Sequence, residues 1–165
     1  MTTTTTTTTM DANTMDESRV ISTLNNLIAT CRDGQSGFES AAEGITDASM
    51  KGAFNKYAQQ RSQFAAELQS EVRMLGADPE TTGSVAGALH RGWINIKAAV
   101  TGKDEHSILE ECERGEDSAK KNYQQALEES LPPTVLNLVN RQYHDVIVAH
   151  DTIRSWRDRT KAASA

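Results

Sequence analysis

The sequence has little of what several functional classes require. Lys and Arg total 17 against 23 Asp and Glu, which gives a formal net charge of -6. Proteins that bind DNA or RNA gather basic side chains into a patch that neutralises phosphates, so this balance argues against a nucleic-acid partner. Apolar runs are short, and none approaches the roughly 20 residues that a membrane-spanning helix needs. We therefore expect no membrane partner.

Cysteine is scarce as well. Cys31 and Cys112 are the only two, and they lack the C-x-x-C spacing of a redox or zinc motif. The start of the chain lacks the basic and apolar regions of a signal peptide, so we expect a cytoplasmic protein. A structural disulfide is not expected in that compartment.

The length of 165 residues suits one domain with a hydrophobic core. We expect residues 1–15 to form a disordered tail, because Thr2 to Thr9 repeat one polar residue that has nothing apolar to bury. Residues 16–160 are expected to form a four-helix bundle, and residues 161–165 a flexible C-terminus.

Four long segments carry apolar residues at alternating steps of three and four, which is the pattern of helices packed in a bundle. They run from Asp16 to a break at 44–49, from Met50 to Gly76, from near Asp104 to Pro132, and from Pro133 to about residue 160. Asp47 is a plausible N-cap, and Ser107 resembles the start of a capping box. Residues 83–102 predict a shorter connecting helix with Trp93 as its packing anchor. The expected fold class is all-α, a ferritin-like four-helix bundle with this short connecting helix between the second and third long helices.

Polar residues on the apolar stripes indicate where the helices meet. Folding the first two helices about Asp47 sets Gly34 opposite Arg61, and folding the last two about Pro132 sets Cys112 opposite His150. A buried guanidinium without a partner is costly, and Glu116 is the one carboxylate on a core stripe at that height. We therefore expect an ion pair between Arg61 and Glu116.

Two interpretations of this level of the bundle remain open. It is a structural polar layer of Arg61, Glu116, Gly34 and His150, or it is a residual metal or small-ligand site. The metal site would hold iron or zinc through oxygen, nitrogen and thiolate ligands, although an adjacent Arg repels a cation. Its candidate ligands are Glu113, Glu116, His150 and Cys112, with Glu39 or Glu43.

Five motifs and a dipeptide carry a family resemblance. They are LNNLI at 24–28, CRDG at 31–34, YAQQRSQF at 57–64, GALHRGW at 87–93, ECERGED at 111–117, and His150-Asp151. In this order and spacing the chain resembles, over residues 18–159, a bacterial ferritin-like four-helix-bundle family of unknown function. The resemblance implies a ferritin-like fold and self-association, often in a stress-response setting, and it implies no established reaction.

The Glu-x-x-His motif of ferritin-like iron proteins is missing, since Ile147 stands three residues before His150. No nucleophile, base and orienting group converge in the pattern. The leading hypothesis is therefore a non-enzymatic, self-associating bundle protein, and the alternative is a metal-binding ferritin-like protein. We expect a homodimer, with Trp93 and Ile96 leaving apolar surface uncovered.

Overall fold

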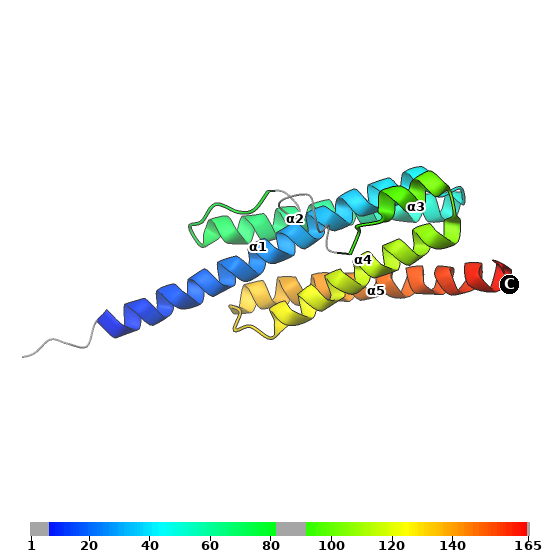
Figure 1. Cartoon of the computed structure of the whole chain (residues 1–165). Helices are drawn as coiled ribbons and strands as arrows, with labels where there is room; N and C mark the ends of the chain where they lie inside the picture. The colour runs from blue at the N-terminus through cyan, green and yellow to red at the C-terminus, as the bar shows by residue number, and fades with distance from the viewer. Residues whose placement is uncertain (1–6, 82–91, 165) are drawn as a thin grey trace, which may run out of the picture.

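The computed structural model describes residues 7–81 and 92–164, and the side chains of residues 16–81 and 92–161. Within these ranges the chain forms five helices and no strand. They are α1 (Thr7–Gly44), α2 (Ala48–Met74), α3 (Ile96–Gly102), α4 (Glu105–Leu127) and α5 (Pro133–Ser164) (Figure 1). The all-α class expected from the sequence is confirmed. Among the described helices, none has the length and apolar character needed to cross a membrane.

The first two helices form an antiparallel hairpin. Only residues 45–47 separate them, and a link this short places consecutive helices side by side in opposite directions. Asp47 is the N-cap of α2, as expected, because its carboxylate accepts a hydrogen bond from the Met50 backbone N–H at 2.9 Å.

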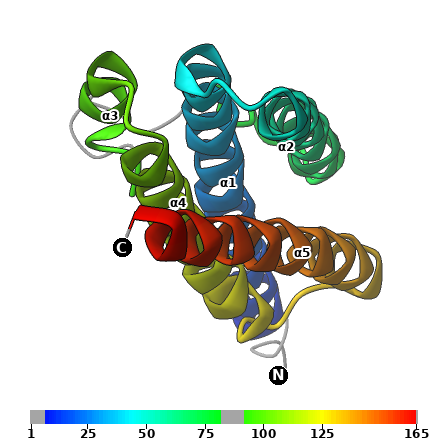
Figure 2. The ribbon, with the colours of Figure 1, turned by 90° about the vertical axis from the view of Figure 1, so that its right-hand side faces the viewer.

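The direction of α4 identifies the type of bundle. Thr30 of α1 accepts a hydrogen bond from Asn122 of α4 at 3.0 Å, whereas Gly37 and Gly115 both lie against Trp93. Residues later in α1 thus contact residues earlier in α4, so these two helices are antiparallel. Since α1 is antiparallel to both α2 and α4, the latter two run in the same direction, and the end of α2 lies at the opposite end of the bundle from the start of α4 (Figures 1 and 2). One long crossover of this kind defines the ferritin-like arrangement.

The core has two apolar clusters. One joins the middle of α1 and the first half of α5 to the second halves of α2 and α4, and it includes Leu24 and Val139. The other lies toward the α1–α2 turn and includes Phe38 and Phe54, whose rings are 5.9 Å apart. A buried polar layer lies where the two clusters meet.

Two helices are longer than the sequence analysis predicts. The predicted tail covers residues 1–15, of which 1–6 lie outside the described residues, but α1 already begins at Thr7. A helix that has formed adds one hydrogen bond for each further residue, which makes extension far easier than initiation. For the same reason α5 continues through the predicted flexible end to Ser164.

The connecting helix is shorter than predicted. Of the expected range 83–102, residues up to 91 lie outside the described part, and the helix that follows is α3, seven residues long. The prediction that Trp93 and Ile96 leave apolar surface uncovered is wrong, because they are only 2% and 5% exposed. Both pack into the second cluster, where their side chains close the space beside α1.

The boundaries of α4 and α5 follow the sequence, with one change at the N-cap of α4. Pro133 begins α5 as predicted, which its fixed φ angle favours. Asp104, not Ser107, is the N-cap of α4, and the Ser107 hydroxyl donates a hydrogen bond to the Asp104 carboxylate at 2.6 Å. Val135 is buried while Leu136 is 40% exposed, since a step of four residues before Val139 returns closer to the same helix face than a step of three.

Candidate functional site

Arg61 and Glu116 form the centre of the buried polar layer. Arg61 comes from the middle of α2 and Glu116 from the middle of α4, and their exposed fractions are 1% and 0%. The two guanidinium Nη atoms donate to the two carboxylate oxygens at 2.6 and 2.9 Å. The ion pair expected from the sequence is therefore present, in the bidentate geometry that favours Arg over Lys.

The charge of Arg61 is held by this pairing. Burial alone would lower the pKa of the guanidinium, but the charge and hydrogen bonds of Glu116 outweigh burial and raise that pKa. Arg61 Nε is buried with no hydrogen bond to any described residue. The pair thus keeps a full cation in the core at some residual desolvation cost.

The space for Arg61 is provided by Gly34. A Cβ atom at Gly34 would stand 3.5 Å from Arg61 Cγ, so these residues face each other as the α1–α2 pairing predicts. The guanidinium carbon also lies 5.5 Å from the ring centre of Phe38 and 5.9 Å from that of Phe64. Aromatic faces on both sides add cation–π attraction to the ion pair.

A chain of hydrogen bonds continues the polar layer. The Cys31 thiol and the Tyr123 hydroxyl are 3.2 Å apart, and that hydroxyl donates to Gln142 Oε1 at 2.7 Å. Gln142 Nε2 in turn donates to the Phe64 carbonyl at 3.3 Å. Gln142 was not among the residues predicted from the sequence, although its spacing of three from Val139 already marked it as a core position.

Neither thiol is available as an anion near neutral pH. Burial raises the pKa of the Cys31 thiol to about 11, and burial followed by the charge of Glu116 raises the pKa of Cys112 well above its usual value. A cysteine binds a metal ion through its thiolate and not through its neutral thiol. Cys112, one of the predicted metal ligands, is therefore poorly suited to that role.

Three further predicted metal ligands, Glu116, Glu39 and Glu43, do not join the others. Both oxygens of Glu116 face Arg61, and Glu39 and Glu43 are exposed on α1. Glu39 accepts a hydrogen bond from neighbouring Gln35 at 3.2 Å. The six predicted ligands do not form one site, because Glu116 is already paired with Arg61, as expected from the sequence.

His150 lies in a different register from the one predicted. It faces Asp117, five residues further along α4 than Cys112, with Nε2 2.6 Å from Asp117 Oδ1. The other ring nitrogen, Nδ1, is 3.0 Å from Asp151 Oδ1. Residues 128–132 join α4 to α5, and this longer link allows α5 to shift along α4 before their side chains interlock.

The shift gathers Glu113, Asp117 and His150. One potential ligand atom from each lies within 4.8 Å of the others. Asp117 was not among the predicted ligands, but its spacing of four from Glu113 places both carboxylates on one face of α4. A pocket of about 270 Å³ adjoins them, and its lining includes Arg157, which forms an ion pair with Glu113.

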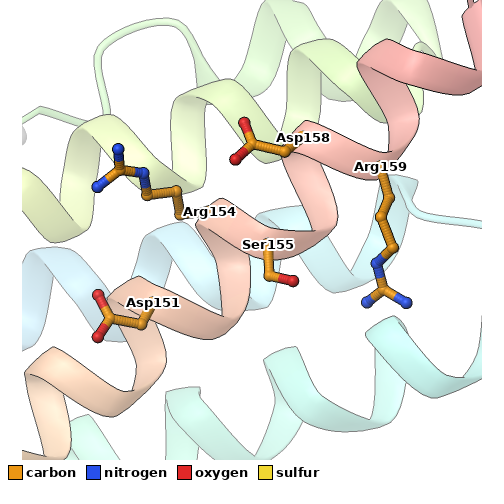
Figure 3. Close-up of a pocket in the computed structure, with 5 residues that line it drawn as sticks. All are labelled: Asp151, Arg154, Ser155, Asp158 and Arg159. Carbon is orange, nitrogen blue, oxygen red and sulfur yellow. The ribbon is translucent and has the colours of Figure 1, made fainter.

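The outer face of α5 carries a shallow hollow of about 620 Å³. Its lining residues all come from α5: Asp151, Arg154, Ser155, Asp158 and Arg159 (Figure 3). Figure 3 shows Asp151 and Arg159 to either side of the small Ser155, with Arg154 and Asp158 along the other edge. Acidic and basic side chains thus alternate on an exposed helix face.

These features define a ferritin-like four-helix bundle with a central buried ion pair. Residues 19–129 match the family described as a domain of unknown function (DUF2383). The match covers more than half of the chain, which therefore belongs to this family. The resemblance and the fold class expected from the sequence are both confirmed.

A solved structure has the same fold. It is a mutant of Dps1 from Mycobacterium smegmatis, with a TM-score of 0.69 over 87% of this chain and 97% of that chain. The two sequences are 11% identical, so the likeness concerns the fold alone. Among curated proteins, none matches this chain.

Proposed function

We propose that this chain is a non-enzymatic, self-associating ferritin-like bundle protein that acts in the cytoplasm. The observation that carries the proposal is the bidentate pairing of Arg61 with Glu116 at the centre of the core. The Arg61 guanidinium occupies the part of the core where a metal site of the bundle would need carboxylates that are free to bind an ion. The polar layer therefore has a structural role, and we expect the protein to bind other molecules through its surface.

The hollow on α5 is the surface that suits a second copy of this chain. A two-fold axis through Ser155 would pack two α5 helices antiparallel, with their two small side chains in contact. Asp151 of each copy would then face Arg159 of the other, since both lie four residues from Ser155. The same face continues to Val148, which is 62% exposed and adds apolar area.

This pattern complements itself only in the antiparallel orientation. Asp151 and Arg159, which lie four residues from Ser155 on either side, carry opposite charges, which is what an isologous contact requires. Exposed ion pairs contribute little energy each, so their main effect is to set orientation and register. We therefore expect a homodimer whose stability falls as added salt screens these charges.

Light scattering on the full chain tests the homodimer. The expected mass at low salt is twice the 18.0 kDa of one chain. Asp151→Arg and Arg159→Asp should each shift the mass toward the monomer by placing like charges opposite each other, and the double variant should restore the dimer. Lys51→Glu on α2 is the control and should change nothing. A monomer mass for the unaltered protein at high concentration would refute the proposal.

A stress-response setting, which the family resemblance implies, is part of this proposal. Survival of cells lacking the chain under oxidative or starvation stress tests it. The alternative function is binding of iron or zinc. It is supported by the cluster of Glu113, Asp117 and His150 on α4 and α5, and not by the buried polar layer.

A further inference from the structure

Glu113, Asp117 and His150 offer two kinds of metal ligand in one place. Each contributes an atom within 4.8 Å of the other two, and the first two residues come from α4 while His150 comes from α5. Carboxylate oxygen and imidazole nitrogen together suit zinc and iron better than magnesium or calcium, which prefer oxygen alone. The adjoining pocket gives solvent, and hence an ion, access to the cluster.

The hydrogen bonds of His150 leave one ring nitrogen directed at the cluster. If Nδ1 carries a proton, it donates to Asp151 at 3.0 Å, and Nε2 is then an acceptor that lies 2.6 Å from an Asp117 oxygen. Two acceptors at that distance repel unless a proton or a cation lies between them. A histidine that donates its other N–H to a carboxylate is the usual arrangement at protein metal sites.

The burial of Glu113 is a second and independent reason to expect a metal ion at this cluster. The residue is 8% exposed, and its Oε2, although it lies beside the Arg157 guanidinium, forms no well-aligned hydrogen bond with the described residues. A buried carboxylate needs compensation by a cation, and Arg157 supplies that charge while no metal ion is bound. Arg157 has another partner in Asp158, to which it donates at 2.8 Å, so it can leave Glu113 to a different cation.

We propose that Glu113, Asp117 and His150 bind one divalent transition-metal ion of the zinc class in each chain. Asp151 orients the imidazole ring, and Arg157 competes with the ion for Glu113. Three protein ligands leave further coordination positions to water, as in zinc sites that are open to solvent. This proposal is independent of the homodimer, because all three ligands belong to one chain.

The test is calorimetric titration of the full metal-free chain with Zn²⁺. We expect one ion per chain, and weakening on the order of 10-fold or more for His150→Ala and for Asp117→Asn. His144→Ala is the matched control, an exposed histidine on the same helix, and should leave the affinity unchanged. Arg157→Met should strengthen binding several-fold, since it removes the competing cation.

Circular dichroism of each variant shows whether it is folded. If His150→Ala unfolds, Asp117→Asn decides the question, because Asp117 is exposed and its loss leaves the core intact. Absence of Zn²⁺ binding by the unaltered chain overturns the proposal, and so does affinity that Asp117→Asn leaves unchanged. Weaker binding by Arg157→Met would overturn the competing role of Arg157. Light scattering on the same samples reports the homodimer separately.

Discussion

Arg61 places a positive charge in the middle of an apolar core, and every neighbour of its side chain contributes to holding it there. Glu116 neutralises the charge, Phe38 and Phe64 face the guanidinium, and Gly34 leaves room for the methylene groups. A buried pair of this kind contributes less than apolar packing of the same volume, but it becomes costly once one partner is removed. At the scale of single residues, stability therefore depends on the pair being complete.

Glu116→Ala should lower the free energy of unfolding by about 3 to 5 kcal/mol, because it leaves Arg61 buried without a counter-charge. Replacing the pair with apolar residues, Arg61→Met with Glu116→Leu, should cost far less. Gly34→Leu should also be destabilising, since the added side chain would occupy the space of Arg61. Urea unfolding followed by circular dichroism measures all three.

The matched control for this series is Glu67→Ala, which breaks the exposed ion pair with Arg141. Exposed pairs contribute at most about 1 kcal/mol, so this variant should stay close to the unaltered protein. A nearly neutral effect of Glu116→Ala would show that Arg61 needs no partner in the core.

At the scale of the helices, the crossover is anchored by one aromatic side chain. The Trp93 ring lies between Gly37 of α1 and Gly115 of α4, and a Cβ atom at either glycine would overlap the ring. Its edge also contacts Phe38, with ring centres 4.9 Å apart. The two glycines therefore allow the segment before α3 to dock closely between two long helices.

Gly115→Ala should destabilise the fold by about 1 to 3 kcal/mol, because the methyl group forces Trp93 out of its position. Gly52→Ala is the control, since it lies in α2 with nothing within 4 Å of the added methyl, and it should stabilise by up to about 1 kcal/mol. Urea unfolding gives the free energies, and tryptophan fluorescence should shift to the red for Gly115→Ala alone. Equal effects of both variants would mean that Trp93 adapts freely.

At the scale of the whole molecule, the bundle depends on two core clusters and not on the first residues of the chain. The earliest described side chain in either cluster is Val20. Although α1 begins at Thr7, most of the stability of a helix comes from packing of an apolar face, and Thr2 to Thr9 supply no apolar face.

Deleting Thr2 to Thr9 should therefore leave the melting temperature unchanged within about 2 °C, and the amides of these residues should exchange with solvent without protection. Calorimetry and hydrogen exchange measure the two effects. A clearly larger drop in melting temperature would show that this segment docks on the bundle or on a second copy.

Apolar spacing and the short first link were enough to predict which faces of the long helices are buried and how α1 meets α2. Apolar spacing sets the rotation of a helix about its axis, and the short link capped by Asp47 leaves little freedom along the axis, so Gly34 opposite Arg61 could be predicted. Glu116 could then be predicted as the partner of Arg61, because a buried cation needs a carboxylate on a core stripe at the same height.

The shift of α5 along α4, and with it the partners of His150, could not be predicted from the sequence and follows from the packing of the whole bundle. Periodicity repeats at every turn, so it does not distinguish Cys112 from Asp117 as the residue opposite His150. That choice depends on how all the side chains of two helices interlock beyond a five-residue link, which no local pattern contains. The cluster of Glu113, Asp117 and His150 is therefore a product of packing, whereas the Arg61–Glu116 pair could be predicted from the chain itself.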